Sequence, residues 1–308
     1  MVQHRRLILV TGAPRTATTP VGNMLARCRG VVSLYEPLGP TGFASLPERY
    51  PILGPGLGLE PELLDGLLDG LRHLRPGKLK TQRRPGAPAR LSTRIFGSRT
   101  LHSFRLAQLQ PWSRTVLWKD PHAIFLAPDL VACGADVDVV VTVRPPRAHA
   151  ASYKRLGWRS KASEVYPRWA ARFGRCELCE RYLDRANDSV VSAALLWRLC
   201  YLPLIRSGAI SSIYLITSED LERNEAGAYL ALMEKLGLDP SKAVDRALSN
   251  ARRQPAASDL GKRVHDWTRS VSSVNSYWKQ VLSPADLQII DSLTSDIVPR
   301  FFSPDYHR

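Results

Sequence analysis

Short apolar runs alternate along the chain with segments whose apolar residues recur about every three to four positions. The runs end at glycine, proline or charged residues and have the length of buried strands. The sequence predicts strands at Leu7–Thr11, Val31–Tyr35, Thr115–Trp118, Val137–Val143 and Ser212–Ile216. Because strands that alternate with helices form parallel sheets covered on both faces, we expect an α/β fold with a central parallel sheet flanked by helices.

The periodic segments predict helices between and after these strands. We expect helices at Thr18–Arg27, Glu62–Leu74, Ala123–Cys133, Pro146–Leu156, 162–183, 189–206, 225–236 and Pro284–Ile297. Ser283 is a suitable N-cap for the last helix, since Pro284 fits its first position. The glycine- and proline-rich segment Pro37–Pro61 predicts a long loop. Neither a repeat nor a sharp boundary interrupts the sequence, so we expect a single domain over residues 1–308.

A basic insert at residues 72–99 departs from this alternation. Prolines and glycines interrupt it, and it contains no aspartate or glutamate. Its basic residues are Arg72, Arg75, Lys78, Lys80, Arg83, Arg84, Arg90, Arg94 and Arg99. One interpretation is a solvated loop. The other is a mobile basic flap over an anionic substrate or surface.

The whole chain is basic, with 43 lysines and arginines against 28 aspartates and glutamates and a net charge of +15. Its 44% hydrophobic and 23% charged residues are typical of globular proteins and exclude wholesale disorder. Such a surface attracts anions: nucleotides, sulfated or phosphorylated substrates, nucleic acid or acidic lipid. The first apolar run is too short for a signal peptide, and no later run has the length of a membrane span. We therefore expect a cytoplasmic protein with no signal peptide and no membrane span.

Five scattered cysteines fit reduced thiols in a cytosolic protein. Cys176 and Cys179 form a C-x-x-C segment, which is found in zinc and redox sites. The sequence has no second pair and no nearby His-x3-His, which favours a helix that carries two thiols. We expect no metal site.

The segment Val10–Thr19, which reads VTGAPRTATT, lies between a predicted strand and a predicted helix. Backbone N–H groups at such a helix start, with the positive end of its dipole, bind phosphate. The Walker A pattern would place glycine, lysine and Ser/Thr where this chain has Ala17, Thr18 and Thr19. The lysine that reaches the β- and γ-phosphates is missing, and the cation of the loop is Arg15. This suits a ligand with a 5′-phosphate and one further anionic group, held without magnesium.

Residues Gly12–Thr19 resemble the 5′-phosphosulfate-binding loop of sulfotransferases, P-R-S-G-[ST]-[ST]. Val141–Ser152 is similar to the 3′-phosphate-binding element of the same family, in which an apolar strand precedes R-[DP]-P and a serine eight residues after the arginine. Departures from the pattern are mild: Ala17 replaces the usual glycine and Pro145 the common aspartate. Other segments similar to the family, in its order, are Leu34–Leu38, Trp118–His122, Ser218–Leu221 and Trp278–Pro284, with Arg269 nine residues before Trp278.

This resemblance implies a P-loop NTPase-like sulfotransferase fold and the donor 3′-phosphoadenosine 5′-phosphosulfate, with adenosine 3′,5′-bisphosphate as product and no metal. The acceptor would be a hydroxyl or amine of a carbohydrate, lipid or small molecule. Lys119 would neutralise the transferring group, while Arg15 would also stabilise the leaving 5′-phosphate. The implied donor-binding residues are Pro14, Arg15, Thr16, Ala17, Thr18 and Thr19 at the 5′ end, and Arg144, Ser152 and, more weakly, Arg269 at the 3′-phosphate.

Two residues compete as the general base that takes the acceptor proton. Glu36 directly follows the second strand, in a segment similar to the L-Y-E-P segment of carbohydrate sulfotransferases, and is the favoured candidate. It could instead cap a loop or helix. His122 lies near the place where the cytosolic branch of the family has its histidine, but Asp120 and Pro121 before it could simply start a helix. Four aromatic residues could line the acceptor pocket or belong to the core: Trp112, Trp158, Tyr166 and Trp169.

Two other functions compete with this interpretation. A P-loop kinase or NTPase would need magnesium and a lysine at position 18, where the chain has Thr18. A non-enzymatic nucleic-acid-binding protein would explain the charge. The sequence has no RNA-reading signature and no known DNA-binding module, so we expect no nucleic-acid partner.

Overall fold

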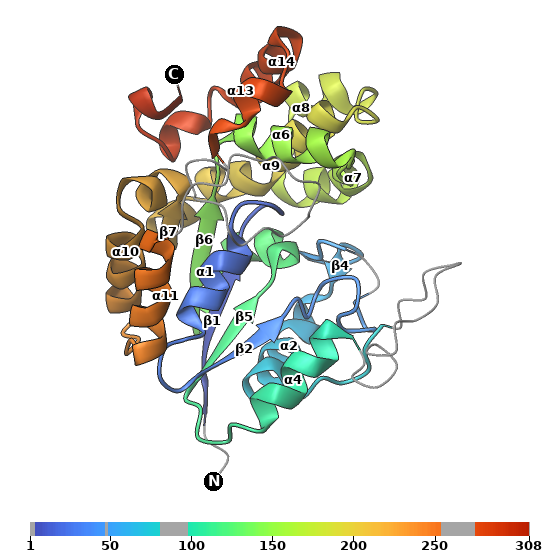
Figure 1. Cartoon of the computed structure of the whole chain (residues 1–308). Helices are drawn as coiled ribbons and strands as arrows, with labels where there is room; N and C mark the ends of the chain where they lie inside the picture. The colour runs from blue at the N-terminus through green and yellow to red at the C-terminus, as the bar shows by residue number, and fades with distance from the viewer. Residues whose placement is uncertain (1–3, 47–48, 81–97, 254–274, 308) are drawn as a thin grey trace, which may run out of the picture.

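A five-stranded parallel sheet forms the centre of the computed structural model, which describes residues 4–46, 49–80, 98–253 and 275–307. The strand order is β2-β5-β1-β6-β7 (Figure 1). Their bounds are β1 Arg6–Thr11, β2 Val31–Tyr35, β5 Thr115–Lys119, β6 Val137–Val143 and β7 Tyr214–Thr217. All five predicted strands are confirmed within two residues at each end, and the α/β fold class with them.

The strand order places β1 between two strands that come later in the chain. Val10 of β1 pairs with Lys119 of β5, and Thr11 pairs with Val141 of β6. Because all pairs are parallel, the carboxyl ends of β1, β5 and β6 lie at one edge of the sheet. In open α/β sheets, ligands bind in the crevice outside this edge, where the chain crosses from one side of the first strand to the other.

Both faces of the sheet are buried. Leu7 and Leu9 of β1 belong to one hydrophobic core, whereas Ile8 and Val10 belong to another. Successive residues of a strand point to opposite faces, so a strand covered on both sides is apolar without interruption. This explains why β1 appears in the sequence as a continuous apolar run.

The two cores are covered by different helices (Figure 1). Helices α1 (Thr18–Leu25), α10 (Ser218–Lys235) and α11 (Lys242–Arg253) cover the core of Ile8 and Val10. The helices that contribute to the other core are α2 Pro61–Arg72, α4 Arg99–Gln108, α6 Pro146–Leu156, α7 Ala162–Phe173, α9 Ser189–Arg206 and α14 Pro284–Thr294.

Some predicted helices have different bounds in the structure. Segment 162–183 forms two helices, α7 and α8 (Glu177–Leu183), because α7 ends at Gly174 with a φ of 85°. Segment 123–133 begins as the 3₁₀ helix η1 (Pro121–Leu126) and continues as α5 (Ala127–Ala132). The predicted cap of α14 is confirmed, since the Ser283 hydroxyl accepts from Asp286 N in a capping box.

Several elements of the structure carry no clear signal in the sequence. Helices α4, α11 and α13 (Trp278–Val281) were not predicted. The predicted loop 37–61 contains a two-stranded parallel ladder, formed by β3 (Ile52–Leu53) and β4 (Gly58–Leu59). Of the basic insert, residues 81–97 lie outside the described residues. Its described ends are folded: Arg72 ends α2, Lys80 N donates to Gly42 O, and Arg99 begins α4.

Helix α9 corrects one expectation. It has 18 residues with a mean hydropathy of 1.3, long and apolar enough to cross a membrane, although no such segment was expected. In the structure 83% of it is buried inside the protein. This is the environment of a core helix.

Candidate functional site

The loop between β1 and α1 is fixed against β6 by short contacts. Gly12 has a φ of 149°, and a Cβ there would lie 2.4 Å from Thr142 O, so no other residue fits. The Thr16 hydroxyl donates to Ala13 O at 2.5 Å and lies 3.1 Å from the Thr142 hydroxyl. The Tyr201 hydroxyl donates to Thr142 O and accepts from Ala13 N. The Thr16 hydroxyl is thus used inside the loop, and the sequence analysis missed Tyr201.

The start of α1 is open to an anion. Arg15 and Ala17 both have a positive φ, 75° and 72°, and Ala17 offers no side-chain cap. The first N–H groups of a helix lack intrahelical partners, so the amides of Thr18 and Thr19 are available to a ligand; Pro20 has no N–H, and Val21 N already donates to Ala17 O. His149 supports the loop from α6, because its Nε2 donates to Pro14 O at 3.0 Å. Burial, with the positive charge of Arg144, lowers the pKa of His149 to about 3, which leaves the ring neutral.

Arg15, Arg144 and Ser152 meet at the carboxyl end of β6. Arg15 Nε donates to Ser152 Oγ at 3.1 Å, and Arg144 Nη1 donates to Arg15 O at 3.5 Å. Asn275 supports the group, because its Oδ1 accepts from Arg144 Nε at 2.7 Å. The structure therefore brings the two sequence motifs together and places the Arg15 guanidinium on the Arg144 side of the loop. The proposed partner Arg269 lies outside the described residues.

This group concentrates positive charge in a buried place. Arg144 is only 4% exposed, and burial lowers its pKa. Burial and the nearby charge of Arg144 lower the pKa of Arg15 in the same way. The guanidinium carbons of Arg144 and Arg155 lie 5.7 and 5.8 Å from the centre of the Tyr277 ring. Like charges held together in a desolvated place favour an anionic ligand.

A second group lies at the carboxyl ends of β2 and β5. Lys119 Nζ donates to Glu36 Oε1 at 2.8 Å and lies 3.8 Å from the centre of the Tyr35 ring. The Lys119 side chain is 3% exposed, and that of Glu36 is 19% exposed. A Cβ on Gly22 of α1 would lie 2.6 Å from Lys119 Cγ, so the lysine packs directly against α1. This ion pair therefore lies on the β5 side of the loop, and Arg144 lies on the β6 side.

Asp120 connects this ion pair to the following helix. Its Oδ2 accepts from Leu38 N at 2.6 Å, and its Oδ1 accepts from His122 N at 2.9 Å. Burial raises the pKa of Asp120 to about 7, with a further contribution from the Glu36 charge. Asp120 thus fixes the segment that presents Glu36. The sequence analysis gave it no role beyond a helix start, although it directly follows Lys119 at a strand end.

His122 lies in a different environment from Glu36. It follows the N-cap Asp120 and Pro121 at the start of η1, and its ring lies 4.8 Å from that of Tyr50. Burial lowers its pKa to about 4. Among the described residues, no group accepts or donates a hydrogen bond at its buried Nδ1.

The four aromatic candidates separate into different environments. Trp158 is 40% exposed, and the Arg15 guanidinium carbon lies 5.8 Å from the centre of its ring. Tyr166 and Trp169 are buried and stacked on each other, which makes them core residues. Trp112 is 67% exposed at the surface. Of the four, Trp158 is the one that contacts the site.

Within the described part of the chain, no group of three or more His, Cys, Asp or Glu side chains could hold a metal ion. No family model and no curated protein matches the chain.

The chain is similar in overall trace to two solved structures. The first is the sulfotransferase domain from the Synechococcus PCC 7002 olefin synthase, with a TM-score of 0.46 and 16% identity over 94% of this chain and 95% of that one. The second is sulfotransferase STF1 from Mycobacterium tuberculosis H37Rv, with a TM-score of 0.38 and 16% identity over 91% of this chain and 78% of that one.

Proposed function

We propose that the protein is a sulfotransferase that uses 3′-phosphoadenosine 5′-phosphosulfate as donor. The observation that carries this proposal is the convergence of Arg15, Arg144 and Ser152 beside the open amides of α1. One nucleotide with phosphates at both ends of its ribose would contact both groups. A nucleotide with a single 5′ phosphate chain would leave Arg144 and Ser152 without an anion.

The chain's residues divide the donor between them. The amides at the start of α1 would bind the 5′-phosphate, and Gly12 would let the backbone approach it. Arg144 and Ser152 would bind the 3′-phosphate with a charged fork and a hydroxyl. Arg15 lies between the two sites, so its guanidinium would contact either phosphate. The Walker lysine is absent at Thr18, which argues against a kinase-type site.

The Glu36–Lys119 pair would carry out the transfer. A Glu36 carboxylate oxygen takes the proton from the acceptor hydroxyl or amine as that atom bonds to sulfur. The bond from sulfur to the 5′-phosphate oxygen breaks, and Lys119 and the loop amides stabilise the charge on the leaving phosphate. Sulfuryl transfer should parallel phosphoryl transfer, in which positioning and electrostatics supply most of the catalysis. No step in this scheme needs a metal.

The surroundings of the two candidate bases favour Glu36. Its carboxylate is partly exposed, so an acceptor can reach it. It also contacts Lys119, which places the base beside the group proposed to stabilise the transfer. His122 is buried against the Tyr50 ring, so an acceptor has less access to it than to the Glu36 carboxylate.

A transfer assay tests this proposal. The full chain is incubated with the donor, without added metal, and with acceptor panels of carbohydrates, lipids and small alcohols and amines. We expect acceptor-dependent formation of adenosine 3′,5′-bisphosphate together with a sulfated product. If the protein binds duplex or single-stranded nucleic acid without the donor, and forms no sulfated product with any acceptor, the non-enzymatic alternative is favoured.

A further inference from the structure

The C-x-x-C segment lies away from the proposed donor site. Cys176 precedes the first residue of α8, and Cys179 lies one turn further along. Both are buried, with 4% and 0% of their surfaces exposed. The side chains of Cys176 and Cys179 interact, and the Cys179 thiol lowers the pKa of Cys176. The two sulfurs are therefore neighbours, as expected for the two ends of a C-x-x-C turn.

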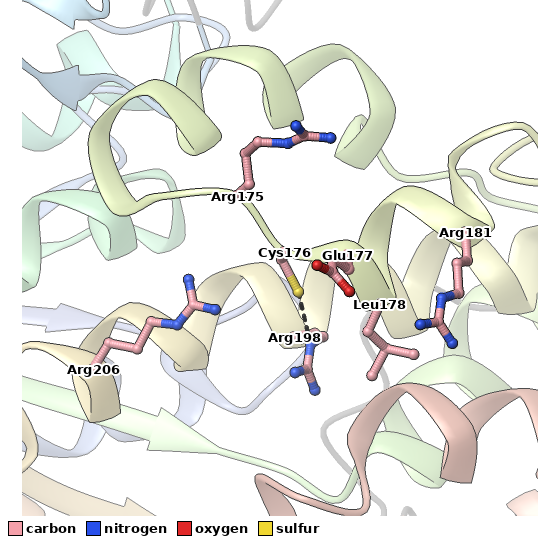
Figure 2. Close-up of a pocket in the computed structure, with 7 residues that line it drawn as sticks. All are labelled: Arg175, Cys176, Glu177, Leu178, Arg181, Arg198 and Arg206. Carbon is pink, nitrogen blue, oxygen red and sulfur yellow. Dashed lines mark hydrogen bonds between the residues drawn. The ribbon is translucent and has the colours of Figure 1, made fainter.

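A fixed cation lies against Cys176. Arg198 Nε of α9 is 3.4 Å from Cys176 Sγ (Figure 2). The other two nitrogens of Arg198 donate to the Asp296 carboxylate at 2.6 and 2.9 Å, and one of them also donates to Leu293 O. The guanidinium is thus held in place whatever the charge of the sulfur. The Cys179 thiol and Arg198 both lower the pKa of Cys176, whereas Cys176 and burial raise the pKa of Cys179.

Cys176 also lines a cavity of about 400 Å³, a size typical of small-molecule sites. The charged groups around it come from α8, from the turn before it and from α9 (Figure 2). Arg175 is paired with Glu180, and Arg206 donates to Phe173 O. Arg181 makes no hydrogen bond to any described residue. The charged lining residues are Arg175, Glu177, Arg181, Arg198 and Arg206.

We propose that Cys176 and Cys179 form a reactive dithiol, and that its substrate is an anionic low-molecular-weight disulfide bound in this arginine-lined cavity. The cavity has the volume for such a molecule. Arg181 and Arg206, which form no ion pair with a described residue, are the guanidinium groups that match its carboxylates. No other cysteine has this arrangement among the described residues: Cys28 and Cys200 are buried with raised pKa values, and Cys133 is exposed.

The exchange proceeds in two balanced steps. The Cys176 thiolate attacks one sulfur of the small disulfide, a mixed disulfide forms, and one small thiolate leaves and takes a proton from water. Cys179 then loses its proton to solvent and attacks the Cys176 sulfur, which releases the second small thiol. The protein gains one disulfide, and the small disulfide is reduced to two thiols. Cys176 is the attacking residue because it faces the cavity and Arg198.

Thiol mapping of the whole, reduced protein tests the proposal. It is exposed to oxidised glutathione, an anionic disulfide, or to cystamine, a cationic one, at about pH 6.5, and peptide mapping follows each cysteine. We expect a Cys176–Cys179 disulfide with oxidised glutathione, with Cys176 reacting about tenfold faster than the exposed Cys133. Cys179→Ser should trap the mixed disulfide on Cys176. The exposed Cys133 should show no preference for the anionic reagent.

The cavity has its own control. Arg181→Gln should slow the reaction with oxidised glutathione severalfold and should leave the reaction with cystamine equal or faster, because a like charge is removed, whereas Arg105→Gln on α4 should change neither. If Cys176 reacts no faster than Cys133 in the wild-type chain, the reactive dithiol is excluded. If Cys176 reacts equally with both reagents, the anionic substrate is excluded.

Discussion

The Arg15 guanidinium donates a hydrogen bond to the Ser152 hydroxyl, although 137 positions separate the two residues. Arg15 belongs to the loop after β1, and Ser152 belongs to the helix after β6. This contact joins the two segments that we propose bind the donor phosphates, so a ligand that moves one of them would also move the other.

The Arg15–Ser152 contact predicts coupling between the two residues in nucleotide binding. Ser152→Ala and Arg15→Ala should each weaken binding of adenosine 3′,5′-bisphosphate, and the double variant should lose less than the sum of both. We expect a coupling free energy of about 0.5–3 kcal/mol, typical of residues in contact. Calorimetric titration of the four proteins measures it. Strictly additive losses would mean that the two side chains contribute to binding independently of each other.

Replacement of the proposed base predicts a loss of turnover without a loss of binding. Glu36→Gln keeps an oxygen for Lys119 but cannot take the acceptor proton. We expect donor affinity within about twofold of wild type and a turnover lower by about 10²–10⁴-fold, the usual contribution of general base catalysis. The measurement compares donor titration with the initial rate of transfer. Unchanged turnover would transfer the role to His122, and His122→Asn would then carry the loss.

Gly22 offers a steric test of the position of Lys119. In a helix, Gly→Ala ordinarily stabilises by about 1 kcal/mol. In Gly22→Ala the new Cβ would lie 2.6 Å from Lys119 Cγ, near the root of the side chain, so the lysine must move. We expect the transfer rate to fall at least about tenfold while the chain stays folded.

Gly66→Ala on α2 is the matched control for Gly22→Ala, because no atom lies within 4 Å of its new Cβ. This variant should keep wild-type turnover and unfold at an equal or higher temperature. Wild-type turnover in Gly22→Ala would show that Lys119 need not occupy its observed position.

Asp120 predicts a pH dependence of stability. Its pKa is raised from the ordinary value of 3.8 to about 7, so the folded chain binds this proton more tightly than the unfolded chain does. The stabilisation is complete below about pH 4 and is lost as the pH rises through about 7. Asp120→Asn removes this proton. Urea titration from pH 4 to 8 should show the stability of wild type falling relative to the variant as pH rises; parallel curves would contradict the raised pKa.

Much of the fold follows from local pattern, and part of the site does too. The strands of the sheet are continuous apolar runs, and capped helices such as α14 carry their own start signals. The order of the strands depends on contacts distant in sequence. Helix α4 was missed because it begins at the last residue of the basic insert, and α8 was joined to α7 because only three residues, 174–176, separate them.

The site shows the same division. Arg15, Arg144 and Ser152 follow predicted strand ends, and the parallel sheet brings such ends to one edge. Asn275 carries no local signal, because it reaches Arg144 from 131 positions away. Tyr201 is one apolar position among many on α9 until the fold places its hydroxyl at the loop. The environments that distinguish Glu36 from His122 likewise depend on burial, which the sequence alone does not contain.

The central claim is that one nucleotide with phosphates at the 3′ and 5′ positions binds both Arg144 and the β1–α1 loop. Its most direct test is calorimetric titration with adenosine 3′,5′-bisphosphate, AMP and ATP, with and without magnesium, on wild type, Arg144→Ala and the control Arg147→Ala, three residues further along in the first turn of α6. We predict a magnesium-independent preference for the bisphosphate, reduced about 10–100-fold by Arg144→Ala, the usual range for a charged hydrogen bond, and retained by Arg147→Ala. Equal affinity of the wild-type protein for the bisphosphate and AMP would contradict the claim.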